Sequence, residues 1–363
     1  MNVSNGFSKI ALSLGILAIA GGLAAWLWFG SSASSHYPRL VVISDNLHQG
    51  DSRAALDVAR EVIGSPTVAP EAKAAAAINT ATVPYDLSGS VEDARTSIRE
   101  LKHIAADESL SRATRASAMN MLALWYAYSG NDRTVFKEIF GDEPYASQRV
   151  PGSRTASIRN IFLASYDVWP TSRAGIGIAS SYISQLFGDE TLSTDVRAQY
   201  LAETERYLRE AEALTADERA FYRAYEETNL YAAFLYWKAY ALGGLAYFQH
   251  GGYGEAYRQA YDELIAFLSE QGTPVQKRRL ALVEWRYATY LLLVDNDAAS
   301  ARAQLEAAVS AVSQSPDPEA DSLTRLVRSI LADAKGAPNA PLVEKLNQTM
   351  AASPEFKAWV ESL

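Results

Sequence analysis

The stretch WKAYALGGLAYFQHGGYGEAYRQAYDELIAFLSE, residues 237–270, decides the fold that we expect for this chain. Its first half repeats apolar residues at helical spacing up to Phe248, and its second half does the same from Ala256 onward. Gly251 and Gly252 separate the two patterns, and glycine allows the positive φ of a tight reversal. The stretch therefore predicts two helices that fold face to face as a hairpin.

Large, small and aromatic side chains follow one another through this hairpin in a fixed order, at Tyr240, Gly244, Tyr247, Gly251, Tyr253 and Ala256. A tetratricopeptide unit places the same kinds of residue at these positions, so the hairpin resembles that family. The resemblance implies that the helix backbones come close at Gly244 and Ala256. Gly243, Glu263 and Leu268 depart from the family, which prefers Leu, Ala and Pro there. The same residues also suit an antiparallel helix pair in any all-α domain.

Two similar segments mark a boundary between repeat units, here called the seam, that recurs along the chain. DESLSRATRA at 107–116 and DETLSTDVRA at 189–198 share Asp-Glu, Leu-Ser and Arg-Ala at the same positions, 82 residues apart. Their serines are Ser111 and Ser193, and Ser at such a place is typical of a helix N-cap. Ala69 and residue 274 occupy comparable positions in the sequence. A repeat of about 41 residues accounts for the intervals between these two positions, Ser111 and Ser193. The same repeat predicts further unit boundaries near residues 152 and 234, where the Ser and Arg of the seam are missing.

We therefore expect an all-α fold, a right-handed solenoid of helical hairpins like those of tetratricopeptide proteins. The repeats span residues 39–316 with a period of about 41, and residues 317–363 form C-terminal capping helices. The β-branched run from Leu40 to Ile43 suits the first helix, and strand signals are otherwise nearly absent.

Residues 10–29 carry no charge and are long enough to span a bilayer as one helix. Lys9 is the only charged side chain before them, so residues 1–9 are expected in the cytoplasm and everything beyond the 30–38 linker outside. The alternative is a cleaved signal peptide, since small residues at 31–33 lie near a possible cut. Both interpretations place the remainder of the chain on the same side of the membrane.

The composition excludes several kinds of partner and chemistry. The formal net charge is −9 and the pI is about 5.1, which argues against nucleic acid or anionic lipid as the main partner. The chain has no cysteine, so it has no disulfides, thiolate nucleophiles or zinc–thiolate sites.

Catalytic and metal-binding motifs are not found in the sequence. The four histidines have no ligand spacing, and no cofactor motif is present. Gly50-Asp51-Ser52 resembles the start of a GDSL hydrolase motif, but no histidine follows His250, so we interpret Asp51 as a helix N-cap. The acidic residues at 295–297 resemble a calcium loop that lacks a ligand and its glycine. We expect no catalytic, cofactor or metal site, and no enzyme.

Thirteen aromatic residues lie between Phe221 and Tyr261. They can form the repeat core, because tyrosine can bury its ring and keep its hydroxyl in water. They can also line a groove for a peptide, a small molecule or a glycan. The family resemblance places the partner-binding residues on the first helix of each unit, at Lys238, Ala241, Leu245, Phe248 and Gln249, and at Asn120, Leu124 and Tyr128.

The sequence thus predicts a single-pass scaffold or adaptor that binds other envelope proteins or peptides outside the membrane. The alternative is an extracytoplasmic ligand-binding protein that uses the aromatic-rich stretch 221–261. The sequence indicates no nucleic-acid partner and leaves the oligomeric state open.

Overall fold

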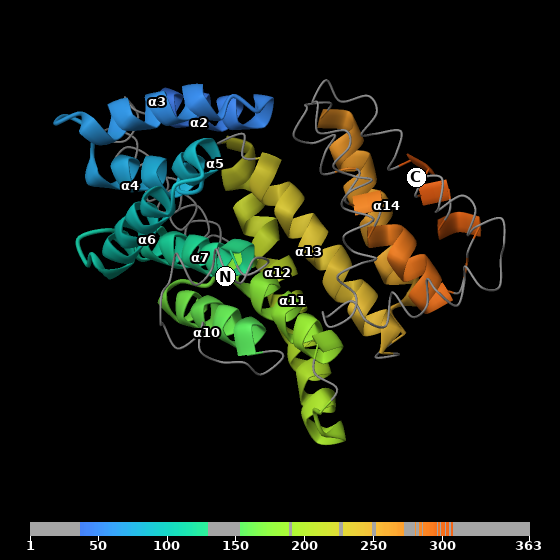
Figure 1. The fold of residues 1–363 in the computed structure, drawn as a ribbon. Helices are drawn as coiled ribbons and strands as arrows, with labels where there is room; N and C mark the ends of the chain where they lie inside the picture. Colours follow the sequence, from blue (N-terminus) through green and yellow to red (C-terminus); the bar gives the residue numbers. More distant parts are fainter. Residues whose placement is uncertain are drawn as a thin grey trace, which may run out of the picture.

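A computed structural model of the chain describes residues 37–129, 153–188, 191–224, 228–248 and 252–271, and parts of 280–307 (Figure 1). The expected membrane segment 10–29 and the expected capping helices 317–363 lie outside these residues. Within the described part, no helix combines the length and the apolar character needed to cross a bilayer.

The described elements are helices, and no strand occurs among the described residues. In chain order they are α2 (Tyr37–Gln49), α3 (Ser52–Gly64), α4 (Pro70–Asn79), α5 (Val83–Ser88), α6 (Val91–Ala106), α7 (Arg112–Ser129), α10 (Ser153–Val168), α11 (Ser172–Gly188), α12 (Thr194–Ala224), α13 (Thr228–Tyr247), α14 (Gly254–Gln271) and a π-helix (Leu291–Asp295). The predicted all-α class is therefore confirmed, and the run from Leu40 to Ile43 lies in α2 as expected.

Helices that are neighbours in the chain pack side by side through the fold (Figure 1). At one end α2, α3 and α4 pack together, and α6 packs on α7. From there α7 contacts α10, α10 contacts α11, and α11 contacts α12. α13 packs against both α11 and α12, and α14 packs on α13. Such a stack of consecutive helices is compatible with a helical-repeat fold.

The turn predicted at Gly252 is found where the sequence placed it, and a glycine also ends α5. α13 ends at Tyr247 and α14 begins at Gly254, with Gly252 between them at φ 73°. Gly89 ends α5 at φ 65° and α6 follows it. Before α3, the carboxylate of Asp51 accepts a 3.0 Å hydrogen bond from the backbone N–H of Ala54. The N-cap interpretation of Asp51 is therefore confirmed.

The two similar seam segments each start a helix. The hydroxyl of Ser111 accepts a hydrogen bond of 3.2 Å from the N–H of Thr114 in α7. The hydroxyl of Ser193 accepts one of 3.4 Å from the N–H of Val196 in α12. Both serines thus satisfy a backbone donor that the first turn of a helix leaves free.

The arginine that lies four residues after each of these serines donates a hydrogen bond to the backbone of the preceding chain. Nε of Arg115 donates 3.1 Å to the carbonyl of Ala105, and Nε of Arg197 donates 3.1 Å to the carbonyl of Leu192. The repeated Ser and Arg positions therefore cap the incoming helix and tie it to the chain before it.

Helix starts follow the expected step over the first half of the fold. α4, α7, α10 and α12 begin at residues 70, 112, 153 and 194, which are 42, 41 and 41 residues apart. The next step, near Phe234, lies inside α13, because α12 runs for 31 residues. Thr215, a residue type suited to a helix cap, lies within α12, where its hydroxyl donates a hydrogen bond of 2.8 Å to the carbonyl of Ala211.

Small residues in α13 allow close packing against elements other than its hairpin partner. A Cβ added at Gly244 would overlap the side chain of Ile183 in α11. A Cβ added at Gly243 would lie 2.6 Å from the ring of Tyr290. The close approach that the sequence assigned to the hairpin at Gly244 is thus made to α11.

Candidate functional site

The predicted partner residues of α13 face the neighbouring helices. Nζ of Lys238 lies 3.2 Å from Oε1 of Glu212 in α12 and 3.8 Å from Oε2 of Glu263 in α14. Ala241 and Leu245, further along the same face, have no exposed surface. This part of α13 therefore contributes to packing, and Lys238 joins α12 to α14.

The last two predicted residues of this group lie at the end of α13. The half-buried ring of Phe248 is 5.0 Å from the ring of Phe187 in α11. Gln249 lies outside the described residues. Phe248 thus connects the end of α13 to α11.

The predicted residues of α7 lie in a different part of the stack. Asn120 is 2 % exposed, and its Nδ2 donates a 3.3 Å hydrogen bond to the hydroxyl of Thr171, just before α11. Its Oδ1 is buried without a partner. Leu124 is half-buried against the largest core cluster, and the side chain of Tyr128 lies outside the described residues. Asn120 therefore links α7 to the turn that precedes α11.

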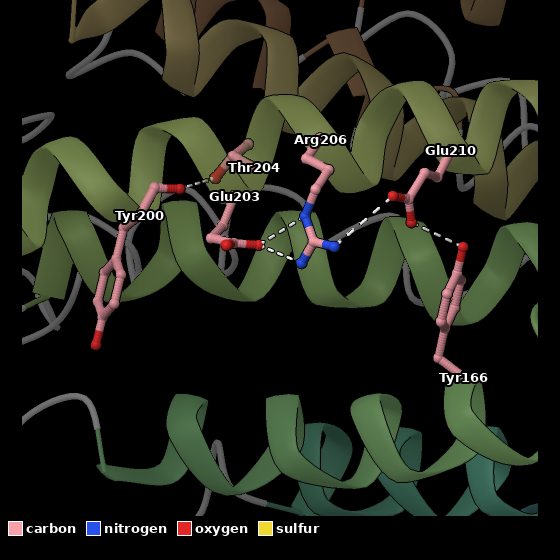
Figure 2. A network of polar contacts seen from close by, with 6 residues as sticks. All are labelled: Tyr166, Tyr200, Glu203, Thr204, Arg206 and Glu210. Carbon is pink, nitrogen blue, oxygen red and sulfur yellow. Dashed lines mark hydrogen bonds and ion pairs between the residues drawn. The ribbon is translucent and has the colours of Figure 1, made fainter.

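A polar network connects α10 with α12 (Figure 2). Arg206 donates two hydrogen bonds, of 2.9 and 2.5 Å, to Oε2 of Glu203, and lies 3.8 Å from Oε1 of Glu210. From α10 the hydroxyl of Tyr166 donates 2.9 Å to the other oxygen of Glu210. Burial and this carboxylate raise the pKa of Tyr166 to about 12, so its hydroxyl stays a donor. Every charge in the network has a partner.

Arg159 holds α10, α11 and α12 together by a different contact. It is 8 % exposed, and its Cζ lies 4.3 Å from the ring centre of Tyr182 and 5.1 Å from that of Tyr200. Nη1 donates a 2.6 Å hydrogen bond to Oε1 of Gln185. In the part of the chain that the structure describes, no carboxylate lies within ion-pair distance of Arg159. Two aromatic faces and one amide therefore stabilise this cation.

A second arginine lies among tyrosines at the other end of the fold. Tyr236 and Tyr240 of α13, Tyr261 of α14, and Arg286 and Tyr290 form what we call the tyrosine–arginine cluster. Cζ of Arg286 lies 5.3 Å from the ring centre of Tyr240. The tyrosine oxygens, that of Tyr236 above all, raise the pKa of Arg286. The guanidinium of Arg286 therefore lies over the ring of Tyr240.

Not all polar groups of this cluster have partners. The hydroxyl of Tyr240 lies 3.1 Å from the hydroxyl of Ser184, and that of Tyr290 donates 3.1 Å to the carbonyl of Tyr240. The hydroxyl of Tyr261 is buried without a hydrogen-bond partner. Arg286 has no carboxylate within ion-pair distance among the described residues.

Sequence reasoning found Tyr236, Tyr240 and Tyr261 of this cluster but missed Arg286 and Tyr290. The aromatic enrichment between 221 and 261 ends before both of these residues. An isolated arginine has no signal in the sequence, because the residues that surround it come from α13 and α14. The cluster is our candidate functional site.

Most of the aromatic enrichment belongs to the core. Tyr257 and Tyr261 have no exposed surface, and the ring of Tyr261 stacks on that of Tyr287 at 5.0 Å with an angle of 5°. Tyr290 packs 6.0 Å from Tyr261 and 6.1 Å from Tyr257. The burial of these residues agrees with their interpretation as core.

The acidic residues at 295–297, which resemble a calcium loop, make hydrogen bonds within the fold. Asp295 accepts hydrogen bonds from Tyr257 and from Arg258, whose Nη2 lies 2.8 Å from Oδ1. Asp297 caps the next helix through a 3.0 Å hydrogen bond from the N–H of Ser300. Across the described residues, no group of three or more His, Asp or Glu side chains could hold a metal ion.

A cavity of about 200 Å³ lies between α3 and the turn from α5 to α6. Its lining includes Arg60 and Asp57, which pair at 3.6 Å, and Ser88, whose hydroxyl donates 2.5 Å to Asp93. Most of its polar groups therefore already have partners, and its opposite charges favour no particular ligand.

Comparison with known proteins assigns no family. No protein-family model, curated protein or solved structure matches the chain.

Proposed function

We propose that this protein is a membrane-anchored helical-repeat scaffold that binds other proteins of the cell envelope outside the membrane. The observation that supports this most is the stack of helices from α7 to α14, in which each helix packs on its neighbours in the chain. Such a stack forms an extended surface along its length, and proteins with this architecture use that surface for binding. The anchor at residues 10–29 is inferred from the sequence.

The charge of the exposed surface indicates the kind of partner. α14 carries Glu255, Asp262, Glu263 and Glu270 but only one basic residue, Arg258, which pairs with Asp295. The chain as a whole has a net charge of −9. We therefore expect partners that present basic surfaces, because complementary charge speeds association and selects among partners.

Site-specific photo-crosslinking in native membranes tests this function. A photoreactive phenylalanine analogue replaces Arg209 of α12 or Glu270 of α14, both of which are exposed, and Arg99 of α6 serves as the control position. We expect a discrete adduct of one mass from α12 or α14 and none from α6. Recovery of the uncrosslinked protein alone, or the same adducts from all three positions, would count against a specific partner on this surface.

A further inference from the structure

The cavity between α3 and the turn from α5 to α6 lies at the same end of the fold as α2 and α4 (Figure 1). Its volume is about 200 Å³. A site for one water needs roughly 10–15 Å³, so this cavity holds a group much larger than a water. None of the residues that line it is aromatic. The cavity therefore has room for a small ligand and offers no ring on which an aromatic ligand could stack.

Three of the residues that line the cavity are apolar. Leu56 of α3 is buried, Pro84 of α5 is half-buried, and Leu87 of α5 is 41 % exposed. An aliphatic group placed against these side chains would remove their accessible carbon atoms from water, together with its own. This part of the cavity therefore favours an aliphatic body.

α3 also contributes three charged side chains to the cavity. Arg53, Asp57 and Arg60 are spaced four and then three residues apart, so they share one face of the helix. By sign alone the charges favour no particular ligand, because these two arginines balance Asp57 and Asp93. An added anion or cation would disturb this balance, whereas a ligand with one charge of each sign preserves it.

The charges of the cavity differ in how well they are paired. Asp93 accepts a hydrogen bond of 2.5 Å from the hydroxyl of Ser88, so it is already used within the turn. Asp57 and Arg60 approach to 3.6 Å, which is beyond hydrogen-bond distance, and both side chains are mostly exposed. Among the described residues, Arg53 has neither a hydrogen bond nor an ion pair. Arg53 and Asp57 are therefore the groups that an incoming ligand can engage.

These two groups match the two charges of an amino acid. Arg53 and Asp57 lie one helical turn apart, so their side chains are neighbours on the helix surface. A free α-amino acid carries a carboxylate and an ammonium on a single carbon atom. The carboxylate has the planar pair of oxygens that suits a guanidinium, and the ammonium is a donor that suits a carboxylate.

We propose that this cavity binds a free α-amino acid with an aliphatic side chain, such as leucine. Its carboxylate accepts hydrogen bonds from Arg53, and its ammonium donates to Asp57. Its side chain lies against Leu56, Pro84 and Leu87. This binding site is independent of the scaffold function, because it requires no partner protein.

Calorimetric titration of the full chain in detergent tests the site with leucine and three analogues. Leucinamide lacks the carboxylate, N-acetylleucine lacks the ammonium, and glycine lacks the side chain. We expect leucine to bind at least about tenfold more tightly than each analogue, because each loses a charged hydrogen bond or the apolar contact.

The analogues also separate a free amino acid from a peptide end. Leucinamide resembles the first residue of a peptide, and N-acetylleucine resembles the last. Binding of either analogue as tight as that of leucine would overturn the proposal, because a peptide terminus would then suffice. Absence of leucine binding would overturn it as well.

Three variants assign the contacts. Arg53→Met should remove the preference for leucine over leucinamide, and Asp57→Asn the preference over N-acetylleucine, because each variant lacks the group that reads the difference. Leu87→Ala should narrow the gap between leucine and glycine. All three positions are exposed, so the variants should fold. Arg209→Met in α12 is the control, an exposed arginine outside the cavity. A preference that persists in Arg53→Met or Asp57→Asn, or that is lost in Arg209→Met, would contradict the assignment.

Discussion

The backbone N–H of Ser111 donates a hydrogen bond of 2.5 Å to Oε1 of Glu71, forty residues earlier in the chain. The hydroxyl of Thr114 donates to the other oxygen of the same carboxylate. Glu71 lies in the first turn of α4, and Ser111 immediately precedes α7. One carboxylate therefore caps the helix of the next unit, where backbone donors and the helix dipole both favour a negative charge.

Replacing this carboxylate should weaken the junction between α4 and α7. Glu71→Ala is expected to lower the free energy of unfolding by about 1–2 kcal/mol, because it leaves a helix N-terminus and a hydroxyl without their acceptor. Urea denaturation followed by circular dichroism measures the change. Glu61→Ala is the control, since the pair of Glu61 with Arg39 at 3.5 Å is exposed and contributes little. Equal losses in the two variants would contradict a special role for Glu71.

A methyl group at Gly244 should disturb the contact between α13 and α11. Because its Cβ would overlap Ile183, Gly244→Ala is expected to cost about 1–3 kcal/mol of unfolding free energy. Gly64→Ala in α3 is the matched control, since nothing lies within 4 Å of the added Cβ. There alanine should be neutral or stabilise by up to about 1 kcal/mol, because it favours helix more than glycine does. Thermal denaturation of both variants checks the difference in sign.

The contacts of Arg159 with the rings of Tyr182 and Tyr200 should contribute to stability. Arg159→Met is expected to lower the free energy of unfolding by about 1–3 kcal/mol, through loss of two cation–π contacts and the hydrogen bond to Gln185. Arg159→Lys should recover part of the loss, because an ammonium can also lie over the rings of Tyr182 and Tyr200. Arg99→Met, which removes an exposed pair with Glu92, serves as control. A loss in Arg99→Met as large as that in Arg159→Met would argue against a stabilising role for these contacts.

Glu284 should make the stability depend on pH. It is buried with one carboxylate oxygen unpaired, and burial raises its pKa to about 7 from an ordinary value of 4.5. The folded state therefore binds a proton more tightly than the unfolded state. The stability that this proton provides is present below pH 4.5 and is lost as the pH rises to about 7.

Comparison with an uncharged side chain isolates this effect. Glu284→Gln should match the original protein in unfolding temperature near pH 4 and exceed it at pH 8, because glutamine resembles the protonated acid. Differential scanning calorimetry at the two pH values measures the gap. A gap of equal size at both pH values would show that Glu284 does not titrate as described.

The helical class and several boundaries could be predicted from the sequence because their causes are local. Gly252 adopts the positive φ that marked it as a turn residue, and Asp51, Ser111 and Ser193 cap helices within three residues of themselves. Thr215 shows the limit of this reasoning. Its hydroxyl finds the carbonyl of Ala211 within the same helix, so a residue suited to a cap lies in the middle of α12.

Only the tertiary structure decided which surfaces face inward and which residues meet. Leu245 lies on a helix face that suited a binding wall, but it is buried because α13 packs against three other helices. Tyr261 and Arg286 come from segments whose proximity depends on how α14 and residues 286–290 pack, which no local pattern records. The sequence by itself determined an all-α chain and its turns, since φ angles, caps and helical spacing act over a few residues. The candidate site needed the fold, because burial and charge balance arise from side chains that are distant in the chain.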